Sequence, residues 1–224
     1  MRSNSRYALI QHAFVALLLI SCFASGASAA TKTWSPTTGG SWAVAGNWSP
    51  SGVPGVGDSV VVPADQSGNI TSVPTISLLS LMINGTCVLG AATSTNTLTV
   101  TGTFSVATGK TLTLGVTGKL NFTLNLSATG SISTVNGFIV HSAGGPTFRN
   151  NGLLKFAPSS TITGVASFML TSGSTLFIGS SAGIASGTTA SGNIRVTGSR
   201  SYNIAANYVY NGTSAQSTGT GYPT

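Results

Sequence analysis

The 224-residue chain has almost no acidic side chains: glutamate is absent, and the only aspartates are Asp58 and Asp65. Charged residues of both signs make up 5% of the sequence. Histidine is nearly as scarce, because His12 lies in a leader-like segment and His141 is the one imidazole that follows it. Hydrolytic and group-transfer reactions draw their acids, bases and activated nucleophiles mainly from these residue types. The sequence therefore predicts a non-enzymatic scaffold or binding surface.

Metal and cofactor sites are not predicted either. Calcium takes about six to eight oxygen ligands, whereas Asp58 and Asp65 stand alone as carboxylates. We expect Asp58 to accept hydrogen bonds from nearby backbone N–H groups at a strand entrance, as Asx side chains do in turns. His141 has no acid, cysteine or histidine near it in sequence that could complete a metal site. We expect His141 at the surface or at a corner.

Cysteine and clustered positive charge are also missing. Cys87 is the one cysteine beyond the leader, which excludes an intrachain disulfide, and we expect it to be a small buried apolar residue. Without the two leader arginines the formal charge falls from +7 to +5. The remaining bases stand singly, with no cluster of the kind that follows a phosphate backbone. Nucleic acid is therefore not a predicted partner.

Residues 1–29 are predicted to be a signal peptide. Arg2 and Arg6 supply its positive charge, residues 13–20 (AFVALLLI) its short apolar run, and residues 27–29 (ASA) its small-residue cleavage site, which places cleavage between Ala29 and Ala30. The alternative is a lipoprotein anchored at Cys22, since residues 19–22 (LISC) resemble a lipobox. The apolar run is shorter than the roughly 20 residues of a membrane-spanning helix, and no transmembrane segment is predicted. Both alternatives place the protein outside the cytoplasm, secreted or on the cell surface.

Beyond the leader the dominant signal is strict alternation of apolar and polar residues, which predicts β-strands with one buried face. The predicted fold is all-β. We expect one set of residues to point inward and the intervening Thr, Asn and Lys outward. The inward set comprises Leu98, Val100, Phe104, Val106, Leu112, Leu114, Leu120, Phe122, Leu124, Leu126, Phe156, Phe168, Leu170, Leu176, Ile178, Ile194 and Val196.

Turn signals leave two all-β architectures open. Residues 100–115 and 116–131 look like two copies of one 16-residue unit, which favours a β-solenoid. Four Asn-Gly pairs, at Asn84, Asn136, Asn151 and Asn211, favour hairpins and hence an antiparallel β-sandwich. Asn and Gly also suit the corners of a β-coil, so the pairs alone do not decide.

Two stretches carry a resemblance to known proteins. Residues 34–63 contain Ser41-Trp42, Asn47-Trp48, Gly52-Val53-Pro54 and Gly57-Asp58-Ser59-Val60. They resemble the N-terminal module of large secreted surface proteins of Gram-negative bacteria, with adhesin- or autotransporter-like β-helix repeats and type IX export. Residues 168–222 are similar to recurring units of the same proteins. The resemblance implies a right-handed parallel β-helix with an N-terminal cap over residues 30–66. Residues 67–224 would form its coils, incomplete at the C-terminal end.

Trp34, Trp42 and Trp48 are the candidate ligand or cap residues. Aromatic rings form sugar-binding platforms in many proteins, but terminal repeats of solenoids are commonly atypical caps, and we favour the cap. The predicted function is an adhesin-like surface protein or structural scaffold whose partners are polysaccharides or other surface components. The alternative is a sandwich-type carbohydrate-binding module that uses the three tryptophans. A third hypothesis is ice or mineral binding along two flat threonine rows, Thr97/Thr99/Thr101 and Thr111/Thr113. The tail after Tyr210 offers no obvious cap, which predicts self-association through the C-terminal end.

Overall fold

The computed structural model describes residues 29–223 except for residues 67, 92–94, 116–118, 126–131 and 143–145. Within these residues the chain forms twenty β-strands and one 3-10 turn, Ala45–Asn47, and no α-helix. The all-β prediction is confirmed. No helix in the described part of the chain has the length and apolar character to cross a membrane. The predicted leader, Cys22 included, lies outside the described residues apart from Ala29.

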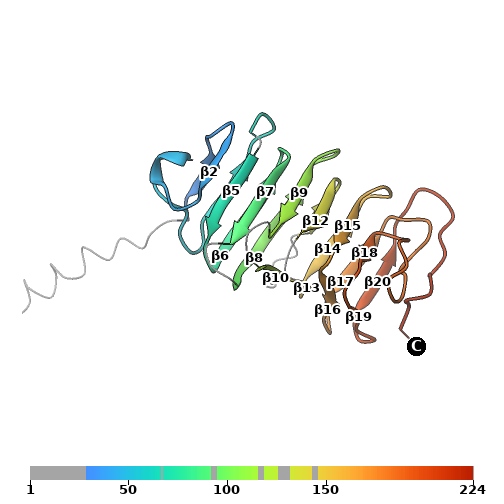
Figure 1. The fold of residues 1–224 in the computed structure, drawn as a ribbon. Helices are drawn as coiled ribbons and strands as arrows, with labels where there is room; N and C mark the ends of the chain where they lie inside the picture. Colours follow the sequence, from blue (N-terminus) through green and yellow to red (C-terminus); the bar gives the residue numbers. More distant parts are fainter. Residues whose placement is uncertain are drawn as a thin grey trace, which may run out of the picture.

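The strands stand side by side in three rows (Figure 1). The first row contains β6 (Ile76–Ile83), β8 (Thr95–Val106), β10 (Lys119–Leu124), β13 (Thr147–Asn150), β16 (Ser167–Leu170) and β19 (Arg200–Tyr202). The second row contains β1 (Thr31–Trp34), β4 (Ser59–Val62), the C-terminal halves of β6 and β8, β11 (Ser133–Val135), β14 (Leu153–Phe156), β17 (Thr175–Ile178) and β20 (Asn207–Tyr210). The third row contains β2 (Gly39–Ser41), β5 (Gly68–Val73), β7 (Cys87–Ala91), β9 (Thr111–Leu114), β12 (Phe138–His141), β15 (Thr161–Gly164) and β18 (Ile194–Val196).

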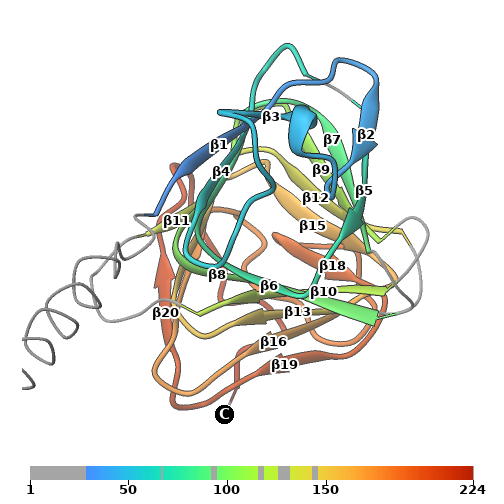
Figure 2. The same cartoon turned by 90° about the vertical axis from the view of Figure 1, so that its left-hand side faces the viewer.

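The chain passes through the rows in rotation, and each strand pairs in parallel with the strand one circuit earlier and later. The end-on view shows the three rows around one interior (Figure 2). Among the described residues every strand pair is parallel except β1 with β3 (Trp48–Ser49), so the antiparallel β-sandwich is wrong. The 16-residue unit is not the structural repeat either, since Leu98 pairs with Phe122 and Phe122 with Phe148. One circuit takes 24 residues in the first case and 26 in the second.

Residues 30–66 contribute strands to the same rows as the rest of the chain. β1 pairs with β4 and β4 with β6 in the second row, while β2 pairs with β5 in the third. The pairing thus continues across residue 66, where the sequence placed the boundary between cap and coils. β3 lies antiparallel on the other side of β1, with Trp34 opposite Trp48.

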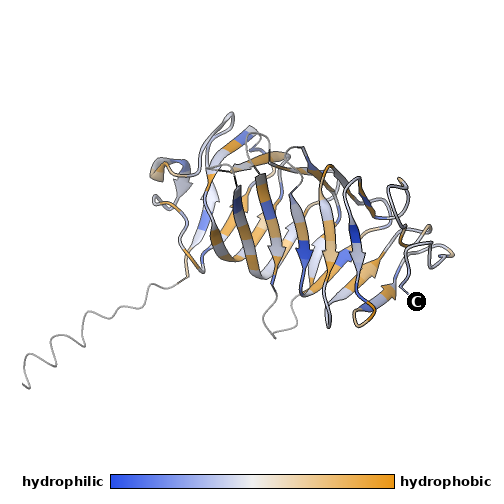
Figure 3. Cartoon of the chain, turned by 60° about the horizontal axis from the view of Figure 1, so that its bottom comes forward, coloured by the Kyte–Doolittle hydropathy of each residue, from blue (hydrophilic) through white to orange (hydrophobic). Residues whose placement is uncertain are grey.

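Alternation along the strands creates one continuous core. All of the residues predicted to point inward are buried, except Leu126, which lies outside the described residues. Thr99, Thr113 and Asn121 between them are partly exposed, so the predicted register is correct. Apolar and polar segments therefore follow one another along the strands (Figure 3). Inside, Phe122, Phe148 and Phe168 stack with ring-centroid separations of 5.1 and 5.9 Å.

The long strand β6 turns a corner and belongs to two rows. Ile76 and Leu78 are buried before the corner, and Leu81 and Ile83 after it, so the inward phase shifts by one residue. The pairing register with β8 shifts at the same point, between Leu78 and Ser80. Leu79 at the corner is 47% exposed because the shift turns it outward.

Three of the Asn-Gly pairs, at Asn84, Asn136 and Asn151, lie between strands of different rows and not in hairpins. The fourth, at Asn211, follows β20, the last strand of the described residues. Asn136-Gly137 joins β11 to β12, which belong to different rows. A Cβ atom at Gly137 would lie 2.2 Å from the carbonyl oxygen of Lys110 and 2.5 Å from that of Ala107. Glycine is needed here because the backbone of the preceding circuit approaches closely.

The C-terminal tail lies against the last circuit. The Gln216 side-chain amide donates to the carbonyl oxygens of Ile178 and Ser180 at 2.8 and 2.9 Å. Ile184 N–H donates to Thr218 O at 3.1 Å, and the rings of Tyr208 and Tyr222 are 5.2 Å apart. The tail is therefore tied to the segment that follows β17. The outer edges of β19 and β20 carry no further strand among the described residues.

Candidate functional site

The three tryptophans lie in the core at the N-terminal end. Trp34, Trp42 and Trp48 are only 1–2% exposed. The ring of Trp48 meets those of Trp34 and Trp42 edge to face, with centroids 5.0 and 4.7 Å apart, and its Nε1 donates to Trp42 O at 2.8 Å. A sugar stacks on an exposed ring face, and none of these rings presents one. The tryptophan platform is therefore contradicted by the burial of all three side chains.

His141 is buried, which contradicts the expectation of a surface or corner position. It lies on β12, where Ile139 and His141 point inward and Phe138 is 37% exposed. Neither ring nitrogen has a hydrogen-bond partner among the described residues, and the ring is 6.3 Å from that of Phe148. Burial lowers the pKa of His141 to about 4, so the imidazole is neutral near pH 7. The alternation from Ile139 to His141 is the sequence signal that predicts this position.

Cys87 is buried and free, as expected. Burial raises the pKa of its thiol to about 12, which keeps the thiol protonated at neutral pH. A protonated buried thiol is a poor nucleophile and a poor metal ligand.

Asp58 has the role that the sequence predicted. It stands directly before β4, and its two carboxylate oxygens accept hydrogen bonds from Ala30 N and Gly55 N, each at 2.8 Å. Asp65 is exposed in the segment between β4 and β5. The described residues contain no group of three or more His, Cys, Asp or Glu side chains placed to hold a metal ion.

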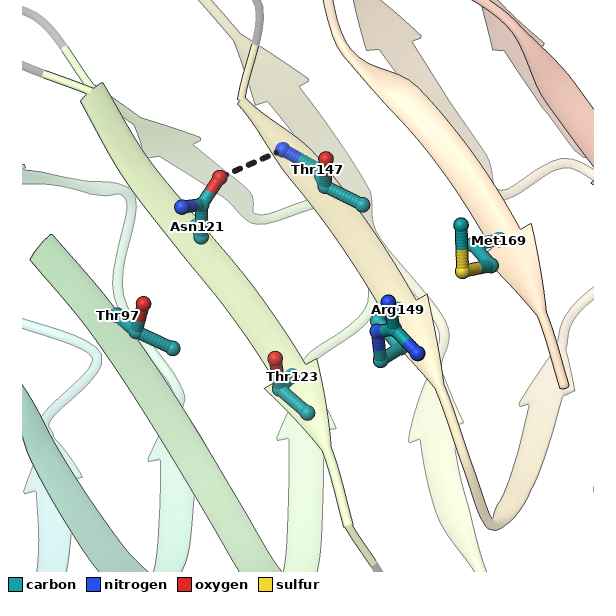
Figure 4. A pocket seen from close by; sticks show the side chains of 6 residues that line it. All are labelled: Thr97, Asn121, Thr123, Thr147, Arg149 and Met169. Carbon is teal, nitrogen blue, oxygen red and sulfur yellow. Dashed lines mark hydrogen bonds between the residues drawn. The ribbon is translucent and has the colours of Figure 1, made fainter. Parts of the chain in front are cut away.

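The outward side of the first row carries a shallow hollow of about 270 Å³. Its lining comes from four neighbouring strands, because residues two apart on a strand share a face and parallel register aligns them across strands. Asn121 pairs with Thr97, and Thr123 leads through Arg149 to Met169. The lining residues are Thr97, Asn121, Thr123, Thr147, Arg149 and Met169 (Figure 4).

The Asn121 side chain of this hollow is held by the neighbouring strand. Asn121 Oδ1 accepts a hydrogen bond from Thr147 N at 2.9 Å, which ties β10 to β13 at one end of the hollow (Figure 4). The Asn121 amide and the hydroxyls of Thr97 and Thr123 supply donors and acceptors without charge. Arg149 is exposed and is the one charged residue among the described lining residues. The arrangement suits a hydroxyl-rich ligand that also carries a negative group.

Sequence reasoning found part of this surface. It singled out Thr97 and Thr99 as outward residues of one strand. It missed the contribution of Arg149 and Met169, since their alignment with Thr123 depends on circuits of 26 and 20 residues. Circuits of unequal length leave no fixed period from which the alignment could be read.

Comparison with known proteins finds no matching family model, no matching curated protein and no matching solved structure.

Proposed function

We propose that this chain is a secreted, non-enzymatic surface protein, folded as a right-handed parallel β-helix, which binds polysaccharide along the outward side of its first row. The β-helix is supported by three parallel rows that the chain visits in rotation. The right hand follows from the strong preference of parallel crossovers for that sense. Under this proposal residues 30–66 cap the N-terminal end, because β3 covers β1 and the three tryptophans fill the interior there.

The non-enzymatic part of the proposal rests on the state of the few reactive side chains. Both oxygens of Asp58 already accept backbone hydrogen bonds, and His141 is enclosed in the core. A general acid–base pair needs two groups within reach of one substrate. Asp58 precedes β4 in the second row, whereas His141 lies on β12 in the third row. Neither ring nitrogen of His141 has a hydrogen-bond partner among the described residues.

The observation that carries the binding proposal is the hollow of the first row. It presents an amide, hydroxyl groups and one guanidinium on a surface formed by four neighbouring strands. A polysaccharide offers the complementary hydroxyls along its length, so weak contacts at several circuits add to useful avidity. Arg149 favours chains that carry carboxylate or sulfate groups. Asn121, Arg149 and Met169 interrupt the threonines on the outward side of this row. The row therefore lacks the regular threonine array that binding to ice or mineral would need.

The test is affinity electrophoresis through gels that contain alginate, an acidic polysaccharide, or dextran, a neutral one. We expect alginate to retard the protein, and Arg149→Gln to weaken this binding about two- to fivefold, as for loss of an exposed charge contact. Lys155→Gln is the matched control, because Lys155 is an exposed base on β14 in the second row. The proposal is contradicted if neither gel retards the protein, or if both variants weaken binding equally. Release of reducing sugar ends that depends on Asp58 or His141 would contradict its non-enzymatic part.

A further inference from the structure

Asp58 holds the backbone nitrogen of Ala30, the residue that follows the predicted cleavage site. Ala30 N donates to Asp58 Oδ1 at 2.8 Å, and Gly55 N donates to Asp58 Oδ2 at 2.8 Å. Ala30 O in turn accepts from Ser59 N at 2.8 Å. Ala30 is therefore fixed on both its nitrogen and its oxygen before β1 begins, while the preceding Ala29 is exposed.

We propose that cleavage between Ala29 and Ala30 converts this hydrogen bond into an ion pair that anchors the mature N-terminus on Asp58. A signal peptidase, acting from outside this chain, hydrolyses the Ala29–Ala30 peptide bond with one water molecule. Ala29 leaves with a new carboxylate, and Ala30 retains its nitrogen as an α-ammonium group. The nitrogen keeps its place 2.8 Å from Asp58 Oδ1, within the range of a charge-assisted hydrogen bond. The inference goes beyond polysaccharide binding and does not depend on it.

The surroundings of Ala30 leave Asp58 as the one acidic partner in reach. The elements packed around it are β1, β4, β6 and the loop of residues 50–58. Among these described residues the charged side chains are Lys32 and Asp58. The Lys32 ammonium points to the carbonyl oxygens of Pro50 and Ser51, each 3.2 Å away, so it does not occupy the Asp58 oxygens that hold Ala30 and Gly55. Asp58 thus contributes both to the turn before β4 and to retention of the processed end.

The first experiment determines the mature end. The full chain is exported from a Gram-negative host with its own leader, and the product is analysed by intact mass and N-terminal sequencing. We expect the sequence to begin at Ala30. A product that begins at a lipidated Cys22, or at any other residue, would overturn the inference.

The second experiment measures the charge on the pair. We expect the Ala30 α-amino group to titrate with a pKa above about 8.5, beyond the range of about 7.7 ± 0.5 for N-termini of folded proteins. Asp58→Asn should return it to that range, whereas Asp65→Asn, which removes the other, exposed aspartate, should not.

A chain with one extra glycine before Ala30 tests the same ion pair if Asp58→Asn fails to fold. This chain keeps Asp58 and the Ala30 N–H, but its α-ammonium group lies on the added glycine and no longer at Ala30. We expect this chain to melt below the mature protein at pH 6 and level with it at pH 10, since the ion pair is lost as the α-ammonium deprotonates. An α-amino group with an ordinary pKa, or equal melting at both pH values, would overturn the inference.

Discussion

At the scale of single residues, the buried polar side chains differ in whether they form hydrogen bonds. Asn193 is 2% exposed, and its amide nitrogen donates to Ala157 O and Ser160 O while its oxygen accepts from Ser180 N. Asn150 likewise bonds Thr175 O and Gly152 N from inside the core. Such bonds satisfy backbone groups at corners that strands leave unpaired. His141 differs, because neither of its nitrogens has a bonded partner among the described residues.

The buried His141 predicts loss of stability in acid. Burial lowers its folded-state pKa from 6.5 to about 4, so between these values the unfolded chain binds a proton that the folded chain excludes. The free energy of unfolding should therefore fall as the pH drops through this window, by a total of about 3 kcal/mol. Urea denaturation at pH 7 and pH 4.5 measures the fall.

A His141→Leu variant is the control for that measurement, since it removes the titration and fills a similar volume. His141 is the one histidine of residues 30–224, so the difference between the two proteins isolates its contribution. Equal losses of stability in wild type and variant would contradict the assignment of the acid sensitivity to His141.

The sequence predicted the residues of the core better than its polar exceptions. Alternation fixes which side of a strand is buried, because successive side chains point to opposite faces. It placed Leu98, Phe122 and Leu176 correctly. The same alternation places His141 in the core. However, a single imidazole with no acid, cysteine or histidine near it in sequence gave no chemical reason to expect burial. The need for glycine at Gly137 could not be foreseen, because it arises from a carbonyl of the preceding circuit.

At the scale of elements, strands were predictable and their partners were not. The Asn-Gly pairs at Asn84, Asn136 and Asn151 separate strands that belong to different rows, and a local dipeptide contains no information on that choice. Circuit lengths vary for the same reason. Phe148 and Phe168 are paired at a separation of 20 residues, whereas Phe168 and Arg200 are paired at 32. The longer circuit contains the loop between β17 and β18, against which the C-terminal tail lies.

Gln216 is the residue that holds this tail most directly. Its amide nitrogen bonds two carbonyl oxygens, of Ile178 and Ser180, and its oxygen accepts from Gly212 N at 2.7 Å. We expect Gln216→Ala to cost about 1–3 kcal/mol in local stability, because it leaves these groups without their partner. Hydrogen exchange should accelerate at β20 and in the tail while β9 and β10 remain protected.

Self-association through the C-terminal end remains a prediction, and the same variant tests it. Loosening the tail should expose more of the open edges of β19 and β20 and increase the association seen by sedimentation velocity. Ser214→Ala, an exposed change in the same tail, is the matched control. Exchange and association that are identical in the two variants would contradict a capping role for Gln216.

At the scale of the whole molecule, the strands form three rows. The distance between two residues of one row grows with the number of strands between them and not with their separation in sequence. In the third row an unbroken register leads from Asn69 through Val88, Thr113, Val140 and Thr163 to Arg195. Thr163 is therefore four strands from Asn69, and Arg195 is five. The hollow of the first row, where we propose that polysaccharide binds, depends on the same arrangement.

Spin-label distances along this register test the arrangement most directly. Labels on cysteines placed at Asn69 and Thr163, and at Asn69 and Arg195, should lie about 19 and 24 Å apart, at about 4.8 Å per strand. Cys87 remains unlabelled, because burial raises its pKa to about 12. The account predicts narrow distributions that differ by about one strand spacing. A label at Arg195 as close to Asn69 as the label at Thr163, or broad distributions for both pairs, would contradict it.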